Sequence, residues 1–242
     1  LTPDDFSSVD LPPGRTVLKI ACGKVHTCCI LDDESVVCCG GNDQGIVGNG
    51  RNSASVCKEW NDGTCGANLV PVNLGYGRVA VDIATGADWS CAVLDNGGVH
   101  CWGYNGFSWL GVDSLKFVGN IGDSPLEPGG IVEPITFQGG KAVKIFGLAQ
   151  SRCVILDVGD VVCWGKSTNG QLGIGTEGTL SALWERTEYP TVDLGGRKAF
   201  ALAVGGGTDN TGYLVAHQCA MLSAADCEEC EDEIKCWGYN GQ

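Results

Sequence analysis

The sequence predicts an all-β fold built from β-propeller blades, each of about four antiparallel strands. Three observations support this prediction. Four stretches of the 242 residues align on one another. The chain holds 38 glycines and 8 prolines, as expected of a protein with many tight turns. The second cysteine of each copy recurs after 63, 62 and 73 residues, a period typical of repeated four-stranded units.

Each copy contains three predicted strands: a short apolar strand, a strand with a cysteine, and a strand that ends in Cys-Trp-Gly or, in the first copy, Cys-Cys-Gly. A further segment with alternating apolar residues precedes each copy and suits a fourth strand. These segments are 9–11, 71–74, 134–137 and 190–194. We therefore expect one propeller domain, or part of one, over residues 1–242. Its blade-like repeats are expected at about 6–66, 67–130, 131–186 and 187–242.

The shared skeleton resembles the repeat of the regulator of chromosome condensation family. The matching residues are Ile20-Ala21, Gly23, His26, Ile83-Ala84, Gly86, Trp102-Gly103, Trp164-Gly165, Asn169-Gly170-Gln171-Leu172-Gly173 and Trp237-Gly238. This resemblance implies a seven-bladed propeller, whereas the sequence shows four blade-like units. No basic and apolar leader follows Leu1, so we treat the chain as processed or partial. We expect the other blades to come from a longer parent chain or from a second subunit.

The cysteine spacing predicts one disulfide in each hairpin. In three copies ten residues separate two cysteines across a turn, which places them opposite each other on paired strands. These pairs are Cys28/Cys38, Cys91/Cys101 and Cys153/Cys163, and the fourth copy keeps Cys219/Cys236 around a larger loop. Two further local pairs are expected at Cys57/Cys65 and Cys227/Cys230. So many hairpin pairs favour disulfides over a zinc site, for which Cys227-Glu-Glu-Cys230 is the only closely spaced motif.

Three cysteines remain: Cys22, Cys29 and Cys39. Cys29 and Cys39 are expected as diagonal neighbours near the limit of bonding distance, so they either pair or stay reduced. Because the total of 15 is odd, at least one thiol is free or bonded outside this chain, and Cys22 is the first candidate. This pattern indicates an oxidising, extracellular compartment and a secreted, disulfide-containing variant of the family.

The charge of the chain excludes several classes of partner. With 29 acidic and 15 basic residues its formal charge is −14, which repels phosphate backbones and anionic lipid. We therefore expect no nucleic-acid partner. No apolar stretch approaches the roughly 18 residues of a spanning helix, so we expect no membrane span. Charge and cysteines together argue against the nucleotide-exchange and chromatin roles known in the family.

The acidic hairpin tips are weak candidates for binding a cation or a basic partner. They lie at Asp32-Asp33-Glu34, Asp95, Asp157 with Asp160, and residues 226–233, where Glu228, Glu229 and Glu231 are the metal candidates. Acidic residues and glycine are also ordinary turn formers, and no tip has the spacing of a calcium loop. The sequence therefore predicts no metal and no cofactor.

The tryptophans divide into two groups. Those of Cys-Trp-Gly recur at one blade position and are predicted to pack between blades. Trp60, Trp109 and Trp184 lie outside that position, in or near variable segments, and are predicted contact residues. The segments expected to carry specificity are 51–69, 114–132 and 176–189. His26 and His217 share one repeat position and are interpreted as structural, and His100 has no assigned partner.

These observations predict a protein that acts by contact and is not an enzyme, since no catalytic motif is present. The leading hypothesis is an extracellular building block of a cell-surface, matrix or filament assembly of the flagellar-hair kind. Its partners would be other protein chains or other parts of a longer parent chain. The alternatives are a discrete secreted binder or inhibitor, and a lectin-like or cation-binding propeller.

Overall fold

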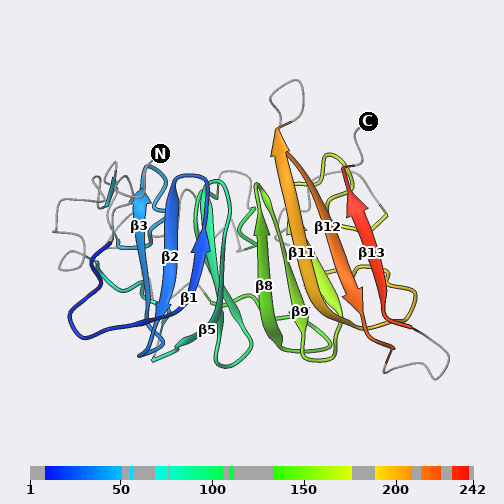
Figure 1. Ribbon diagram of the computed structural model, residues 1–242, viewed down its shortest axis with the longest axis horizontal. Helices are drawn as coiled ribbons and strands as arrows, with labels where there is room; N and C mark the ends of the chain where they lie inside the picture. Colours follow the sequence, from blue (N-terminus) through cyan, green and yellow to red (C-terminus); the bar gives the residue numbers. More distant parts are fainter. Residues whose placement is uncertain are drawn as a thin grey trace, which may run out of the picture.

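The computed structural model describes residues 9–50, 55–56, 69–75, 77–105, 109–111, 133–175, 189–208, 214–224 and 231–239. Within these ranges the chain forms β-strands and no α-helix, so none of the described residues form a helix suited to crossing a membrane. The strands make four antiparallel sheets that follow one another in chain order (Figure 1). The predicted all-β fold of repeated antiparallel units is therefore confirmed.

Across each sheet, the strands lie in the order in which they occur in the sequence. Sheet 1 contains β1 (Val17–Cys22), β2 (His26–Leu31), β3 (Val36–Gly41) and β4 (Ser55–Val56). Sheet 2 contains β5 (Ala80–Thr85), β6 (Trp89–Leu94) and β7 (Val99–Gly103). Sheet 3 contains β8 (Ala142–Leu148), β9 (Ser151–Leu156) and β10 (Val161–Gly165). Sheet 4 contains β11 (Ala199–Thr208), β12 (Leu214–Leu222) and β13 (Glu233–Gly238).

The turns between the second and third strands set the register of the sheets. Gly97 and Gly159 adopt φ values of 82° and 80°, which glycine reaches without steric cost. Their N–H groups donate to the carbonyls of Leu94 and Leu156 at 2.9 and 2.8 Å. With this turn, Cys91 lies directly opposite Cys101 in the ladder. The ten-residue cysteine spacing is thus a consequence of turn length.

Three of the four segments predicted as fourth strands, 71–74, 134–137 and 190–194, lie against the sheet that precedes them in the chain. The Val72 N–H donates to the Val36 carbonyl at 2.8 Å, and single bridges join Ile135 to Val99 and Thr191 to Val162. A proline stands directly before Val72 and Thr191 and before Ile135. Because proline has no N–H to donate, each of these segments makes a contact of one or two residues with the sheet and not a full strand.

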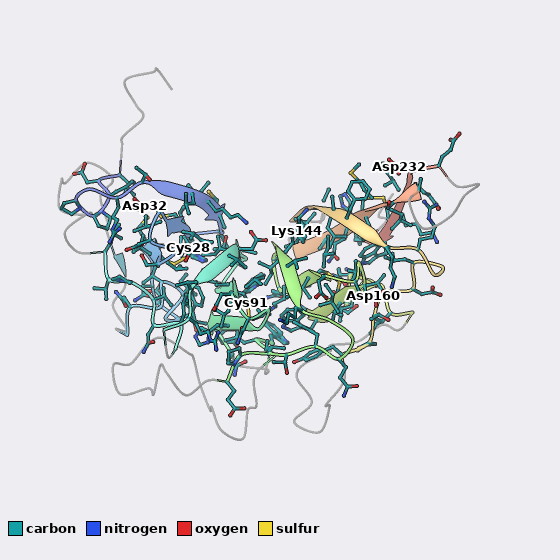
Figure 2. All side chains as sticks on the ribbon, turned by 90° about the horizontal axis from the view of Figure 1, so that it is seen from below. Cys28, Asp32, Cys91, Lys144, Asp160 and Asp232 are labelled. Carbon is teal, nitrogen blue, oxygen red and sulfur yellow. A yellow bond between two sulfur atoms is a disulfide. The ribbon has the colours of Figure 1, made fainter. Side chains whose placement is uncertain are left out.

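The sheets stand side by side in an arc that is open on one side (Figure 2). The first strands of neighbouring sheets contact one another: β1 contacts β5, β5 contacts β8, and β8 contacts β11. Lysines link them: Lys19 Nζ donates to the Val81 carbonyl at 2.7 Å, and Lys144 Nζ donates to the Phe200 carbonyl at 3.0 Å. The Asp82 carboxylate lies between two of these strands, 2.9 Å from Lys19 Nζ and 2.9 Å from the Ile145 N–H.

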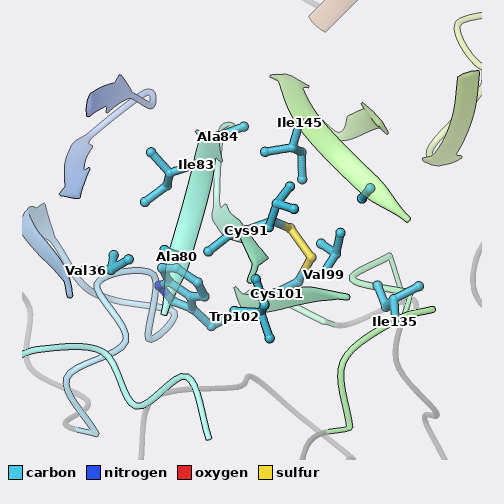
Figure 3. Packing of buried hydrophobic residues seen from close by; sticks show 14 of the residues in the cluster. Val36, Ala80, Ile83, Ala84, Cys91, Val99, Cys101, Trp102, Ile135 and Ile145 are labelled. Atoms are coloured by element: carbon cyan, nitrogen blue, oxygen red, sulfur yellow. A yellow bond between two sulfur atoms is a disulfide. The ribbon is translucent and has the colours of Figure 1, made fainter. Parts of the chain in front are cut away.

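Each sheet has two faces, which we name by their neighbours. The front face of a sheet is turned toward the next sheet in the chain, and the back face toward the preceding sheet. Figure 3 shows both for sheet 2: the Cys91–Cys101 disulfide lies on the side of Ile145 in β8, whereas Ile83 and Trp102 lie on the side of Val36 in sheet 1. The joint between two sheets is therefore a front face packed on a back face.

Candidate interaction surfaces

The front face of every sheet carries a hairpin disulfide. The bonded pairs are Cys28–Cys38, Cys91–Cys101, Cys153–Cys163 and Cys219–Cys236. In the first three sheets these cysteines are buried, because the next sheet covers them. In sheet 4, Cys219 is half-buried and Cys236 is exposed. One disulfide of the described chain is therefore open to solvent while the other three are sealed.

The tryptophan of Cys-Trp-Gly joins each sheet to the one before it. The indole Nε1 groups of Trp102, Trp164 and Trp237 donate to the carbonyls of Ile46, Leu110 and Gln171 at 3.0, 3.2 and 3.1 Å. Those carbonyls belong to the turn after the third strand of the preceding sheet. In sheet 1 this position is Cys39, so its back face lacks the indole that closes the other joints.

None of the described sheets covers the back face of sheet 1. Ile20 is 67% exposed, whereas the residues at the same repeat position, Ile83, Ile145 and Leu202, are 6%, 4% and 8% exposed. A hollow of about 440 Å³ lies on this face. It is lined by apolar residues that include Leu11 and Val37, and no charged side chain takes part. This face therefore resembles the back faces of sheets 2, 3 and 4, except that no described sheet packs on it.

The front face of sheet 4 is uncovered in the same way. Ile234 is 65% exposed, whereas Val36, Val99 and Val161 at that repeat position are fully buried. The neighbouring Met221 is 43% exposed on the same face. The arc thus ends in two apolar faces, a back face at one end and a front face at the other. We call them the head face (back of sheet 1) and the tail face (front of sheet 4).

The three unpaired cysteines among the described residues lie on the head face. Cys22 is exposed, Cys29 is half-buried and Cys39 is buried, and all three line the hollow. Cys22 and Cys39 are the cross-strand neighbours of Thr27 on either side. Burial raises the pKa of Cys29 to about 11, and the nearby Cys39 adds to this shift. Burial also raises the pKa of Cys39, with a smaller contribution from Cys22. Of the two outcomes expected for Cys29 and Cys39, the structure shows separate thiols.

The structure places few of the other predicted contact residues. Trp109 is half-buried, packs edge-on against Tyr104 and lies below the Lys166 ammonium, 6.0 Å from the ring centre. Glu231 is exposed, and its carbonyl accepts a hydrogen bond from Arg197. Among the described residues no group of three potential ligands could hold a metal ion. Outside the described residues lie Cys57, Cys65, Trp60, Trp184, Cys227, Glu228, Glu229 and Cys230, together with most of segments 51–69, 114–132 and 176–189.

The sequence analysis missed Arg152, which is fully buried in the joint between sheets 2 and 3. Its guanidinium lies 4.3 Å from the Trp89 ring centre and 6.0 Å from that of Trp164. Burial lowers its pKa to about 9, and nearby Tyr189 partly opposes the shift. The other copies have Thr27, Ser90 and Gln218 at this position, so the repeat pattern carries no signal for a cation here.

His26 connects the first joint through hydrogen bonds. The Ser90 hydroxyl donates to the Ile46 carbonyl at 2.9 Å, so its oxygen accepts from His26 Nε2 at 2.8 Å. Burial lowers the pKa of His26 to about 4. The buried imidazole is therefore neutral at pH 7 and packs as a structural residue.

This shift predicts a loss of stability in mild acid. The unfolded chain binds a proton at His26 below about pH 6.5, whereas the folded chain does so only near its pKa of about 4. Stability therefore falls as pH drops through this window, by about 2 kcal/mol at pH 5. Urea unfolding at pH 7 and pH 5 measures it. In the His26→Gln variant the amide still donates to Ser90 but does not titrate. Its loss of stability between pH 7 and pH 5 should therefore be smaller by about 2 kcal/mol. An identical pH dependence in both proteins would contradict the assignment.

Comparison with known proteins identifies the repeats. The profile of the regulator of chromosome condensation (RCC1) repeat matches residues 17–46 and 80–108. Among curated proteins, the E3 ubiquitin-protein ligase HERC2 of Homo sapiens is 30% identical over 71% of this chain and 3% of its own length. The Ultraviolet-B receptor UVR8 of Arabidopsis thaliana is 30% identical over 69% of this chain and 34% of its own. The chain thus spans at most about a third of these two relatives.

The fold has solved counterparts. Human WBSCR16 superposes with a TM-score of 0.63 at 16% identity, and the match covers 95% of this chain and 56% of that one. Identity at this level speaks for the fold alone. The four sheets described above are therefore arranged as in a solved propeller of about twice the matched length.

Proposed function

Because the chain carries RCC1 repeats folded as blades of an RCC1-like β-propeller, we propose that it is a structural and protein-interaction module of an extracellular assembly. The observation that carries the proposal is the pair of apolar faces at the ends of the arc, which none of the described sheets covers. Exposed apolar surface of this kind marks a protein contact, since single exposed apolar residues are ordinary but a contiguous face is not.

The contact surfaces are rigid, which suits a building block. Each hairpin is closed by a disulfide, and three of the four are sealed inside a joint. Neighbouring sheets are also tied by an indole to a turn carbonyl. A surface held this way is ordered before its partner arrives, so little conformational entropy is lost on binding.

The disulfides support an extracellular location. Bonds of this kind persist in oxidising compartments and are rare where glutathione and thioredoxin keep thiols reduced. The net charge of −14 speaks against partners rich in phosphate, since it repels a nucleic-acid backbone. The named relatives include a ubiquitin ligase and a light receptor. These activities differ from each other, so neither is carried over.

A second candidate function, a discrete secreted binder, is favoured by one observation. Trp109 lies outside the joint position, beside Tyr104 and Lys166, where it can meet a partner from a loop. Such a binder would use the loops and leave the end faces unused. The two candidates therefore predict different results: substitutions on the end faces should weaken binding by a building block, and substitutions at Trp109 should weaken binding by a discrete binder.

Sedimentation of the purified chain across a dilution series tests the proposal. We use the Cys22→Ser background, so that only non-covalent association is measured. Association should persist, and Ile20→Glu or Ile234→Glu should weaken it at least tenfold, because each places a charge in an apolar contact. The matched control is Val143→Glu, since Val143 is an exposed β-branched residue (42%) on β8, the first strand of sheet 3, and lies on neither end face. It should leave association unchanged.

Two results would overturn this assignment. A chain that is monomeric at every concentration, and binds one target through Trp109, is a discrete binder. If Val143→Glu and Ile20→Glu weakened association equally, the end faces would not be the contact surfaces. The compartment is checked separately by labelling intact source cells with a membrane-impermeant amine reagent, which should modify this protein without lysis.

A further inference from the structure

The hairpin tip of sheet 2, between β6 and β7, carries an exposed asparagine, Asn96, followed directly by Gly97. We propose that Asn96 is a site of spontaneous deamidation: the Gly97 backbone nitrogen attacks the Asn96 side-chain amide, and the tip gains a carboxylate. The site lies in the second of the four sheets and belongs to neither end face. The inference goes beyond the proposed function, since it concerns a covalent change in the chain itself and not its partner.

The turn holds the amide of Asn96 against the main chain that follows it. Asn96 Oδ1 accepts a hydrogen bond from the Gly98 N–H at 3.0 Å, which folds the side chain back over Gly97. The same hydrogen bond polarises the amide carbonyl and stabilises the negative charge that develops on its oxygen during attack. Gly97 has no side chain to shield its nitrogen from the Asn96 Cγ atom. The nucleophile, the electrophile and a donor for the oxyanion therefore meet at one tip.

The reaction needs only water as a co-reactant. The Gly97 N–H, which donates to the Leu94 carbonyl at 2.9 Å, loses its proton to hydroxide, and the nitrogen forms a bond to Asn96 Cγ. The Cγ–Nδ2 bond breaks, the leaving nitrogen takes up a proton from water and departs as ammonia, and a succinimide ring remains. Water then opens the ring at Cγ to give aspartate, or at the main-chain carbonyl carbon to give isoaspartate. The net change is an amide hydrolysed to a carboxylate, without oxidation or reduction.

Other asparagines that precede a glycine are more enclosed. Asn49 and Asn169 are half-buried, and Asn105 is only 4% exposed. Asn169 also uses its side-chain nitrogen as a donor to Thr168 Oγ1 at 3.4 Å. Among the described asparagines that precede a glycine, Asn96 is therefore the one that lies fully at the surface.

Asn73 provides a matched control within the same chain. It is also exposed, and its Oδ1 accepts the Gly75 N–H at 3.0 Å, so its amide is held in the same kind of turn as that of Asn96. The residue that follows it is Leu74, whose side chain hinders the approach of its backbone nitrogen to the amide. The two sites therefore differ mainly in the residue that supplies the attacking nitrogen.

The two products should affect the fold differently. In sheet 1 the same repeat position is Asp33, whose Oδ1 accepts the Ser35 N–H at 3.2 Å, so an aspartate fits this turn. Isoaspartate instead adds a methylene group to the main chain directly before Gly97. The Gly97 carbonyl accepts a hydrogen bond from the Ala142 N–H of sheet 3 at 3.0 Å. The longer main chain displaces this carbonyl, so isoaspartate weakens the joint between sheets 2 and 3.

The test is ageing of the purified protein in neutral and mildly alkaline buffer, followed by peptide mapping that separates asparagine, aspartate and isoaspartate forms. Deamidation at Asn96 should be at least about tenfold faster than at Asn73, because leucine hinders the attack and glycine does not. Its rate should rise with pH, since the attacking nitrogen must lose a proton. Asn96→Gln keeps an amide but must close a larger ring, so this position should stay unmodified over the same period.

The stability of aged protein tests the effect on the joint. Asn96→Asp reproduces the aspartate product, so its urea midpoint should equal that of the parent protein. Aged parent protein, which contains isoaspartate, should unfold at a lower urea concentration than Asn96→Asp. Its Ala142 amide should also exchange with solvent faster. Asn96→Gln aged in parallel should keep its original midpoint, which controls for damage elsewhere.

Several results would overturn the inference. Retention of the amide at Asn96 while Asn73 or Asn169 deamidates would contradict the choice of site. Equal rates at Asn96 and Asn73 would show that attack by Gly97 does not determine the reaction. An equal loss of stability in aged Asn96→Gln would remove the effect assigned to isoaspartate. None of these results depends on association between copies, so the proposed function is tested separately.

Discussion

Replacing Trp164 by alanine should lower the free energy of unfolding by about 3–5 kcal/mol, the usual loss for a large buried aromatic side chain. Trp164 is fully buried, donates to the Leu110 carbonyl and packs against Phe137 and Tyr189. Its removal opens a void in the joint between sheets 2 and 3. Urea unfolding of the two proteins, followed by circular dichroism, measures the difference.

Two companion variants make this prediction specific. Trp164→Phe keeps most of the ring but loses the hydrogen bond, so it should cost about 1–2 kcal/mol. Trp237 has the same bond to the preceding turn but is only half-buried. Trp237→Ala should therefore cost less than Trp164→Ala. Equal losses at the two positions would show that the joints do not determine the stability of the arc.

Removing the Cys91–Cys101 disulfide should cost about 3 kcal/mol. The bond closes a loop of ten residues, and crosslinks of this size stabilise mainly by restricting the unfolded chain. Both cysteines are buried, so the double variant to alanine also removes packing atoms from the joint with sheet 3. The measured quantity is the urea midpoint of the double variant against the parent chain.

The Cys219–Cys236 bond provides the contrast. Cys236 is exposed while the other three disulfides are covered, so a mild reductant should open this bond first. Alkylation and mass spectrometry after partial reduction would identify the modified cysteines. Simultaneous reduction of all four bonds would contradict the distinction between sealed and open front faces.

Much of the architecture could be predicted because it depends on local spacing. Ten residues with a glycine turn place Cys91 opposite Cys101 without any knowledge of the tertiary fold. A tryptophan repeated at one blade position indicates a repeated contact, and its partner is a turn that also repeats. Such repeated features can be predicted from the sequence, since several copies of the repeat show the same pattern.

Features that depend on which sheet lies beside which could not be predicted. Ile20 and Ile83 occupy equivalent positions in corresponding strands, yet only the presence of a neighbouring sheet decides which is exposed. Arc geometry also places Arg152 between Trp89 and Trp164, two residues from different sheets. The contact of 71–74 with the preceding sheet is of the same kind, since the hydrogen bond from Val72 to Val36 is a non-local contact.

The most direct test of the central claim uses Met221, the single methionine of the chain. It lies 43% exposed on the tail face, where the account places the contact between copies. Its oxidation by dilute hydrogen peroxide, followed by intact mass, reports whether that face is covered. We expect slow oxidation in the assembled protein and rapid oxidation in the dissociated Ile20→Glu variant. Equally rapid oxidation in both would contradict it.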